Sequence, residues 1–159
     1  MKVDTLRFGE IDISDDKIIV FENGIPPFED STKYTLINSE ETEPFLWLQS
    51  LDEPNLALAV INPFRLFPDY APAVSDDILE TIGNPPHEDI LVLTVCVILK
   101  DYEKMFTNLV SPILINPSNN QARQVIMENS PYMTKHPIYE RVQALVIGGN
   151  ANAGIDSES

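Results

Sequence analysis

The longest apolar run in the chain is Ile90-Leu-Val-Leu-Thr-Val-Cys-Val-Ile-Leu99, which only Thr94 interrupts. Apolar residues at both odd and even positions of a short run are typical of a strand whose two faces are both covered. The run is too short to span a bilayer as a helix. Lys100 and Asp101 end it. We therefore predict a central strand over residues 90–99.

On either side of this run the pattern is one of further short strands. β-Branched, aromatic or apolar residues gather between turn residues at Ile18–Phe21, Lys33–Ile37, Phe45–Gln49, Leu56–Ile61, Val110–Ile115 and Gln124–Met127. The turn Asp52-Glu-Pro-Asn55 between two of these runs indicates a hairpin. Most of the 13 prolines lie between runs, where they cost no ladder hydrogen bond. The chain is thus predicted to be mainly β, antiparallel or mixed, as a sandwich or barrel.

One helix is predicted after Ala71-Pro-Ala-Val74. Ser75 is a suitable N-cap, and Asp76 and Asp77 suit the positive end of a helix dipole. Ile78, Leu79 and Ile82 form an apolar stripe, and Gly83 is expected to end the helix. For residues 140–147 the periodicity does not decide between a strand and a short helix.

The chain has the length of one domain, and we place it in residues 1–147. From Gly148 onward the sequence offers no core-forming pattern, so residues 148–159 are predicted to be a disordered tail. No signal-peptide pattern opens the chain. Cys96, the single cysteine, cannot form an internal disulfide and lies in the most apolar run, where a thiol behaves as a small hydrophobe. The absence of a disulfide is typical of a reducing compartment, and we expect the protein in the cytoplasm.

Charge is the strongest signal in the composition. Twenty-five acidic against ten basic residues give −15, with −9 in residues 1–53, −6 in residues 54–103 and 0 in residues 104–159. Such a field repels nucleic acid and anionic membranes and attracts basic proteins. The simpler alternative is that the acidity only maintains solubility. The acidic candidates for partner contact are Glu29, Asp30, Glu40, Glu41, Glu43, Asp69, Asp76 and Asp77.

The sequence gives little reason to expect catalysis. It has no phosphate-binding glycine loop, and His87 and His136 lie far apart beside prolines, without metal-ligand spacing. Asp76-Asp77 or the cluster of Glu40, Glu41 and Glu43 could form an acid/base pair, but such loop clusters are usually solvated. We predict a protein that is not an enzyme and holds no cofactor or metal. A small hydrolase or lyase remains an alternative.

An aromatic stretch, Pro63-Phe-Arg-Leu-Phe-Pro-Asp-Tyr-Ala-Pro72, raises the question of a binding surface. So apolar a loop either folds onto its own core or is offered to a partner. Phe64, Phe67 and Tyr70 are therefore candidates for contact with an apolar helix face. Alternation along Phe45–Gln49 predicts that Phe45, Trp47 and Gln49 share one face of a strand.

Several of these segments together resemble the flagellar assembly factor (FliW) family. The resemblance runs in register from about residue 3 to residue 142. It rests on four segments: Phe21-Glu-Asn-Gly-Ile-Pro-Pro-Phe-Glu29 followed by Lys33-Tyr34, Pro44-Phe-Leu-Trp-Leu-Gln-Ser50 followed by Asp52, Pro54 and Leu56, Val60-Ile-Asn-Pro63 leading to Asp69-Tyr70, and Thr107-Asn-Leu-Val-Ser-Pro-Ile-Leu-Ile-Asn116 followed by Gln124-Val-Ile126.

The resemblance implies a single-domain pseudobarrel of two curved, mixed sheets with one or two short helices. It also implies two protein partners, flagellin and the RNA-binding translational regulator CsrA. The expected action is a partner switch that keeps the regulator from flagellin messenger RNA until flagellin is made. A flagellin chaperone without a translational role is the alternative. Direct binding of nucleic acid or membrane is not expected.

Overall fold

The computed structural model describes residues 1–155, and the side chains of residues 1–147. Its strands are β1 (Lys2–Thr5), β2 (Gly9–Asp12), β3 (Ile19–Phe21), β4 (Lys33–Asn38), β5 (Leu46–Ser50), β6 (Ala57–Ile61), β7 (Leu91–Val97), β8 (Phe106–Thr107), β9 (Ile113–Asn116), β10 (Gln121–Gln124) and β11 (His136–Pro137). The α-helices are α1 (Pro63–Leu66), α2 (Asp76–Glu80) and α3 (Tyr139–Ile155). Single 3-10 turns are η1 (Asp15–Lys17), η2 (Glu40–Thr42), η3 (His87–Asp89) and η4 (Tyr102–Lys104).

Seven strands close into a barrel. They follow the order β7-β6-β5-β4-β3-β10-β9, and β9 pairs again with β7 to complete the ring. All of these pairs are antiparallel except β3–β10, which is parallel. β8 and β11 extend the sheet beyond β7, and β1–β2 form a separate hairpin. The predicted mainly-β barrel with mixed pairing is confirmed.

The barrel interior is filled by every second residue of its strands, as the two-residue period of a strand requires. Leu48 of β5, Val60 of β6 and Leu93 of β7 are all completely buried there. Phe21 and Tyr34 meet edge to face, with 5.3 Å between ring centroids. The predicted central strand is confirmed, because β7 pairs with three neighbours, β6, β8 and β9.

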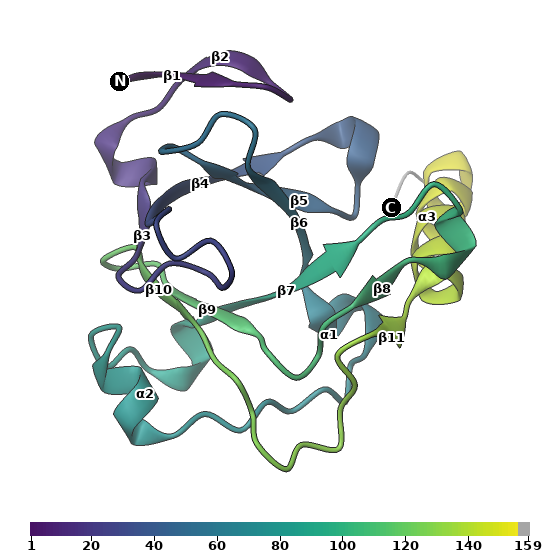
Figure 1. Cartoon of the computed structure of the whole chain (residues 1–159). Helices are drawn as coiled ribbons and strands as arrows, with labels where there is room; N and C mark the ends of the chain where they lie inside the picture. Colours follow the sequence, from purple (N-terminus) through teal and green to yellow (C-terminus); the bar gives the residue numbers. More distant parts are fainter. Residues whose placement is uncertain (156–159) are drawn as a thin grey trace.

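The outer face of β5, β6 and β7 carries a second apolar cluster. Phe45 and Trp47 lie there together, and Leu46 and Leu48 face the interior, as the alternation predicts. Helix α3 covers part of this face through Val142. Figure 1 shows the end of β7 running from the barrel toward α3 and strand β8 returning beside it. Arg141 of α3 donates a hydrogen bond to the carbonyl oxygen of Leu66 in α1 at 2.8 Å.

The helix predicted near Ser75 is confirmed as α2, at the lower left of Figure 1. Its N-cap Ser75 accepts a hydrogen bond from the backbone N–H of Ile78 at 3.4 Å. At the other end Gly83 has φ +91°. The N–H of Asn84 then donates to the carbonyl oxygen of Leu79 at 2.8 Å, which satisfies an end carbonyl of the helix.

Other elements differ from the prediction. β10 begins three residues before the predicted Gln124–Met127, because the turn that ends at Asn120 (φ +57°) starts the β9–β10 hairpin early. Val125 and Met127 remain buried, but beyond the strand. The undecided residues 140–147 belong to α3, which continues to Ile155 through part of the predicted disordered tail. The rest of that prediction, residues 156–159, lies outside the described residues.

Candidate partner-binding surfaces

The acidic candidates lie on four separate parts of the surface, and all are exposed. Glu40 and Glu41 lie in the turn η2 and Glu43 is its C-cap, at the entrance to β5. Glu29 and Asp30 end the loop after β3, Asp69 follows α1, and Asp76 and Asp77 form the first turn of α2. The indole N–H of Trp47 donates to the hydroxyl of Thr42 at 3.0 Å, which holds η2 against the outer face of the barrel.

These carboxylates are almost entirely unpaired within the molecule. In residues 1–147 only Asp12 and Asp101 have an oxygen within 4 Å of a cationic nitrogen, from the N-terminus and Lys104 respectively. The negative charge of the first two thirds of the chain is therefore not neutralised internally. It is available to attract a basic molecule.

The aromatic stretch divides into core and surface. Tyr70 is 4% exposed, and its hydroxyl donates to the carbonyl oxygen of Leu109 at 2.7 Å. Phe67 is half-buried between the His136 ring (4.6 Å) and the Arg141 guanidinium (4.5 Å). Phe64 is 39% exposed. Burial thus removes Tyr70 as a contact residue, which corrects the sequence-based hypothesis for it, and Phe64 remains available.

The loop after β3 closes one mouth of the barrel. Gly24 has φ +67°, and a Cβ there would lie 2.5 Å from the Cα of Glu29. The backbone at the start of the loop is therefore in close contact with the backbone at its end. An isolated bridge joins Ile25 to Phe28. Ile25 enters the interior cluster, whereas Phe28 stays 38% exposed. The loop therefore acts as a plug that offers one aromatic side chain to solvent.

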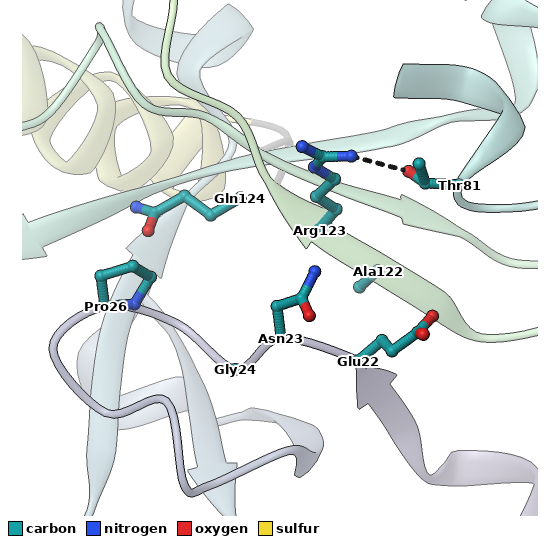
Figure 2. Close-up of a pocket in the computed structure, with 8 residues that line it drawn as sticks. All are labelled: Glu22, Asn23, Gly24, Pro26, Thr81, Ala122, Arg123 and Gln124. Atoms are coloured by element: carbon teal, nitrogen blue, oxygen red, sulfur yellow. Dashed lines mark hydrogen bonds between the residues drawn. The ribbon is translucent and has the colours of Figure 1, made fainter. Parts of the chain in front are cut away.

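Beside this plug lies a hollow of about 290 Å³, shown in Figure 2. Its lining residues are Glu22, Asn23, Gly24, Pro26, Thr81, Ala122, Arg123 and Gln124. Arg123 extends from β10 to Thr81, and its guanidinium donates to the threonine hydroxyl at 3.3 Å. Glu22 and Asn23 enter from the loop on the other side. The pocket combines hydrogen-bonding groups with apolar surface of similar extent.

A second hollow, the mouth groove, lies on the other side of Pro26 and Gln124 and measures about 420 Å³. It is mostly apolar and is lined by Ile25, Pro26, Pro27, Phe28, Leu58, Val95, Val97, Phe106, Asn108, Gln124, Thr134 and Lys135. The ammonium group of Lys135 lies 5.7 Å from the centre of the Phe106 ring.

A third hollow, the outer groove, measures about 590 Å³ and lies on the outer face of β5, β6 and β7. Its lining residues are Arg7, Thr42, Trp47, Ala57, Leu58, Ala59, Cys96, Val97, Ile98, Leu99, Lys100 and Tyr102. Leu58 and Val97 line both the outer groove and the mouth groove. The paired register of β6 and β7 covers only Val60–Val95 and Ile61–Thr94, so both grooves lie beside the unpaired ends of these strands.

Comparisons with known proteins agree with this architecture. The model of the family described as FliW protein matches residues 2–138. The chain belongs to the FliW family. The flagellar assembly factor FliW of Lachnospira eligens is 42% identical over 144 residues, covering 88% of this chain and 95% of the relative. That of Lachnoclostridium phytofermentans is 38% identical over 146 residues, covering 90% and 94%.

A solved crystal structure of the flagellar assembly factor FliW superposes with a TM-score of 0.81 at 33% identity. It covers 87% of this chain and 96% of that chain. The FliW family is thus shown by sequence and by fold. The names of these relatives describe a flagellar assembly factor.

The shifted pKa values of this FliW chain follow from burial and local hydrogen bonds. Burial raises the pKa of Tyr34 and of Tyr70, and it lowers the pKa of His136. A hydrogen bond from Ser14 lowers the pKa of Asp16 at the exposed surface. Within the described residues, no group of three His, Cys, Asp or Glu side chains is placed to hold a metal ion. Over the same part of the chain, no helix is long and apolar enough to cross a membrane.

Sequence reasoning finds the exposed acids but not the grooves of this FliW chain. Arg7, Leu58 and Val97 come from three distant parts of the sequence and meet only through the barrel. The short, polar hairpin β1–β2 that carries Arg7 gives no strand signal. The one available signal is the segment around Trp47, which has more aromatic and apolar residues than a strand with a single buried face requires.

Cys96 should react slowly with a thiol reagent in the native protein. Its side chain is buried in β7, and burial raises the pKa of the thiol to about 12. The sulfur also donates to the hydroxyl of Thr107 at 3.4 Å. We expect labelling at pH 8 to be at least about tenfold slower than in urea, since the thiolate is the nucleophile.

The same burial predicts a pH dependence of stability. Because the folded pKa is raised above the ordinary 9.0, the contribution of the neutral Cys96 thiol is fully present below pH 9 and is lost progressively as the pH rises toward 12. Urea unfolding of the wild type and of Cys96→Ala between pH 8 and 11 measures this loss of stability. In the labelling experiment, equal rates in the folded and unfolded states would contradict the burial of Cys96.

Proposed function

We propose that this flagellar assembly factor binds flagellin and a CsrA-type RNA-binding regulator, and that it relieves repression of flagellin messenger RNA by holding the regulator. Newly made flagellin then binds the protein in place of the regulator, and the regulator binds the messenger RNA again. The observation that carries the proposal is the uncompensated acidic surface. The family membership supplies the flagellar context. The function belongs to the cytoplasm, where messenger RNA is translated.

Electrostatics supports the regulator as one partner. A protein that binds messenger RNA presents a basic surface, because phosphate contacts dominate its affinity. The turn η2 and its C-cap offer Glu40, Glu41 and Glu43 within four residues, all exposed and without a cationic partner within 4 Å among residues 1–147. These acids can steer a basic protein into contact at long range.

The exposed apolar side chains of the mouth groove and the outer groove support flagellin as the other partner. The mouth groove and the outer groove leave Phe28, Val97 and Leu99 each between 38% and 40% exposed. Contiguous exposed apolar surface of this kind marks a site for an apolar segment. The same observation favours the second candidate function, a flagellin chaperone that has no role in translation. The two functions differ in whether a regulator is bound at all.

A three-way titration tests the proposal. The protein is added to a complex of the regulator with a labelled flagellin messenger fragment, and flagellin is added last. We expect the protein to release the RNA and flagellin to restore RNA binding. An RNA complex that micromolar protein leaves untouched would exclude the switch and leave the chaperone function.

Charge reversal gives the matched control. Glu40→Lys with Glu41→Lys should slow association with the regulator roughly tenfold at low salt, whereas Glu128→Lys with Glu140→Lys changes the net charge equally but lies in the neutral third of the chain. The difference should shrink at physiological salt, where the Debye length is about 8 Å. Stopped-flow association rates measure it. Equal slowing by both pairs would mean that only net charge matters.

A further inference from the structure

We infer that the outer groove is the docking site for an apolar segment of flagellin that carries a carboxylate, and that this carboxylate pairs with Arg7. The inference rests on the proposed function for the identity of the partner. It adds the surface, the chemistry of the bound segment and the residue that selects it.

The outer groove has polar and apolar walls, and its exposed apolar side chains include Val97 and Leu99, which are 38% and 40% exposed. Trp47, Ala59 and Cys96 belong to the same outer cluster that α3 covers further along through Val142. At the groove no element of the described chain takes the place of α3, and a hollow of about 590 Å³ remains. Ala57 and Ala59 end at Cβ, so an incoming chain can approach the sheet closely. An apolar occupant would remove this surface from water.

Arg7 gives the groove its selectivity. The guanidinium lies 4.0 Å from the centre of the Trp47 ring, and Phe8 meets the same ring edge to face at 6.4 Å. Within residues 1–147 no carboxylate oxygen comes within 4 Å of Arg7. Over the same residues the other three arginines lack such a partner too, and Arg7 differs from them in lining the outer groove beside Trp47. Stacking fixes the guanidinium plane, which is then ready to bind a carboxylate through two hydrogen bonds.

Charge complementarity decides between the two partners. Arg7 and Lys100 both line the outer groove, so a basic regulator is repelled there and attracted to the acids of η2. An apolar segment with a carboxylate suits the groove in both respects. The two surfaces adjoin, because Thr42 belongs to η2 and also lines the groove. Flagellin in the groove therefore lies next to the acids that we assign to the regulator.

The test measures the affinity for flagellin by calorimetry. Arg7→Gln should weaken binding about tenfold, as expected for a charge pair held against an apolar wall. Ala57→Leu should weaken it by roughly tenfold or more, because the larger side chain fills the groove. Arg65→Gln, which alters an exposed arginine of α1 outside the groove, should leave the affinity unchanged. Thermal melts check that each variant is folded.

A peptide array of overlapping flagellin segments then identifies the bound segment. We expect the bound segment to contain Asp or Glu. A peptide in which that residue is replaced by Asn or Gln should bind the wild type about tenfold more weakly than the original peptide does. The two peptides should bind Arg7→Gln with equal affinity, because the charge pair is already lost. Trp47 is the only tryptophan, so a tryptophan-free peptide should change its emission. If the wild type binds flagellin and both groove variants stay within about twofold of it, the inference is wrong and the proposed function stands. If the wild type does not bind flagellin, the proposed function itself fails.

Discussion

Replacing Gly24 by alanine should destabilise the protein by about 3 kcal/mol or more, because two costs act together. Gly24 has φ +67°, a conformation that costs an L-residue about 1–2 kcal/mol. The new Cβ would also lie 2.5 Å from the Cα and 2.6 Å from the carbonyl oxygen of Glu29. Backbone cannot rotate away as a side chain does. The loop must open, and Ile25, 2% exposed, would lose its place in the barrel interior.

Gly9→Ala is the matched control for this substitution. Gly9 has φ +68°, but a Cβ there meets no atom within 4 Å. It should therefore show only the conformational cost of about 1–2 kcal/mol. Urea unfolding of both variants measures the difference. Equal losses of stability would mean that the contact with Glu29 does not hold the loop closed.

Tyr70→Ala should reduce the free energy of unfolding by about 3–5 kcal/mol, as the loss of a buried aromatic side chain does. The ring packs at 4.7 Å from Tyr132 and belongs to the third apolar cluster, with Leu109 and Met127. Tyr70→Phe keeps the ring but leaves the Leu109 carbonyl without its donor, and should cost about 1–3 kcal/mol. Phe64→Ala should cost under about 1 kcal/mol, since that ring is 39% exposed.

These three variants also separate folding from binding on the aromatic stretch. A loss of partner binding in Tyr70→Ala would follow from unfolding, whereas a loss in Phe64→Ala at unchanged melting temperature would report a contact. Comparable destabilisation by Phe64→Ala and Tyr70→Ala would contradict the division of this stretch into core and surface.

Local pattern explains which parts of the fold are predictable. The strands β3 to β7, the cap at Ser75 and the burial of Cys96 all follow from residues near one another in sequence. The length of α3 does not, because the glycines and asparagines of residues 148–154 are poor helix formers. The closure of the barrel between β7 and β9 likewise depends on contacts that no local period encodes.

The candidate surfaces divide in the same way. Exposure of the acids was predictable, because charged residues in turns are rarely buried. The outer groove was not, since it exists only where the β1–β2 hairpin, β5, β6 and the end of β7 meet. Arg7 carries no signal in sequence, and its role emerges from its position over Trp47.

The parallel pairing of β3 with β10 has a consequence for synthesis on the ribosome. Val20 pairs with Gln121, so the barrel cannot close until about 100 further residues have been translated. At about 5–20 residues per second this interval lasts about 5–20 s. During it the meander β3 to β6 can form from neighbouring hairpins, but its interior face stays open to water. The nascent chain is therefore most prone to aggregation just before its last strands emerge.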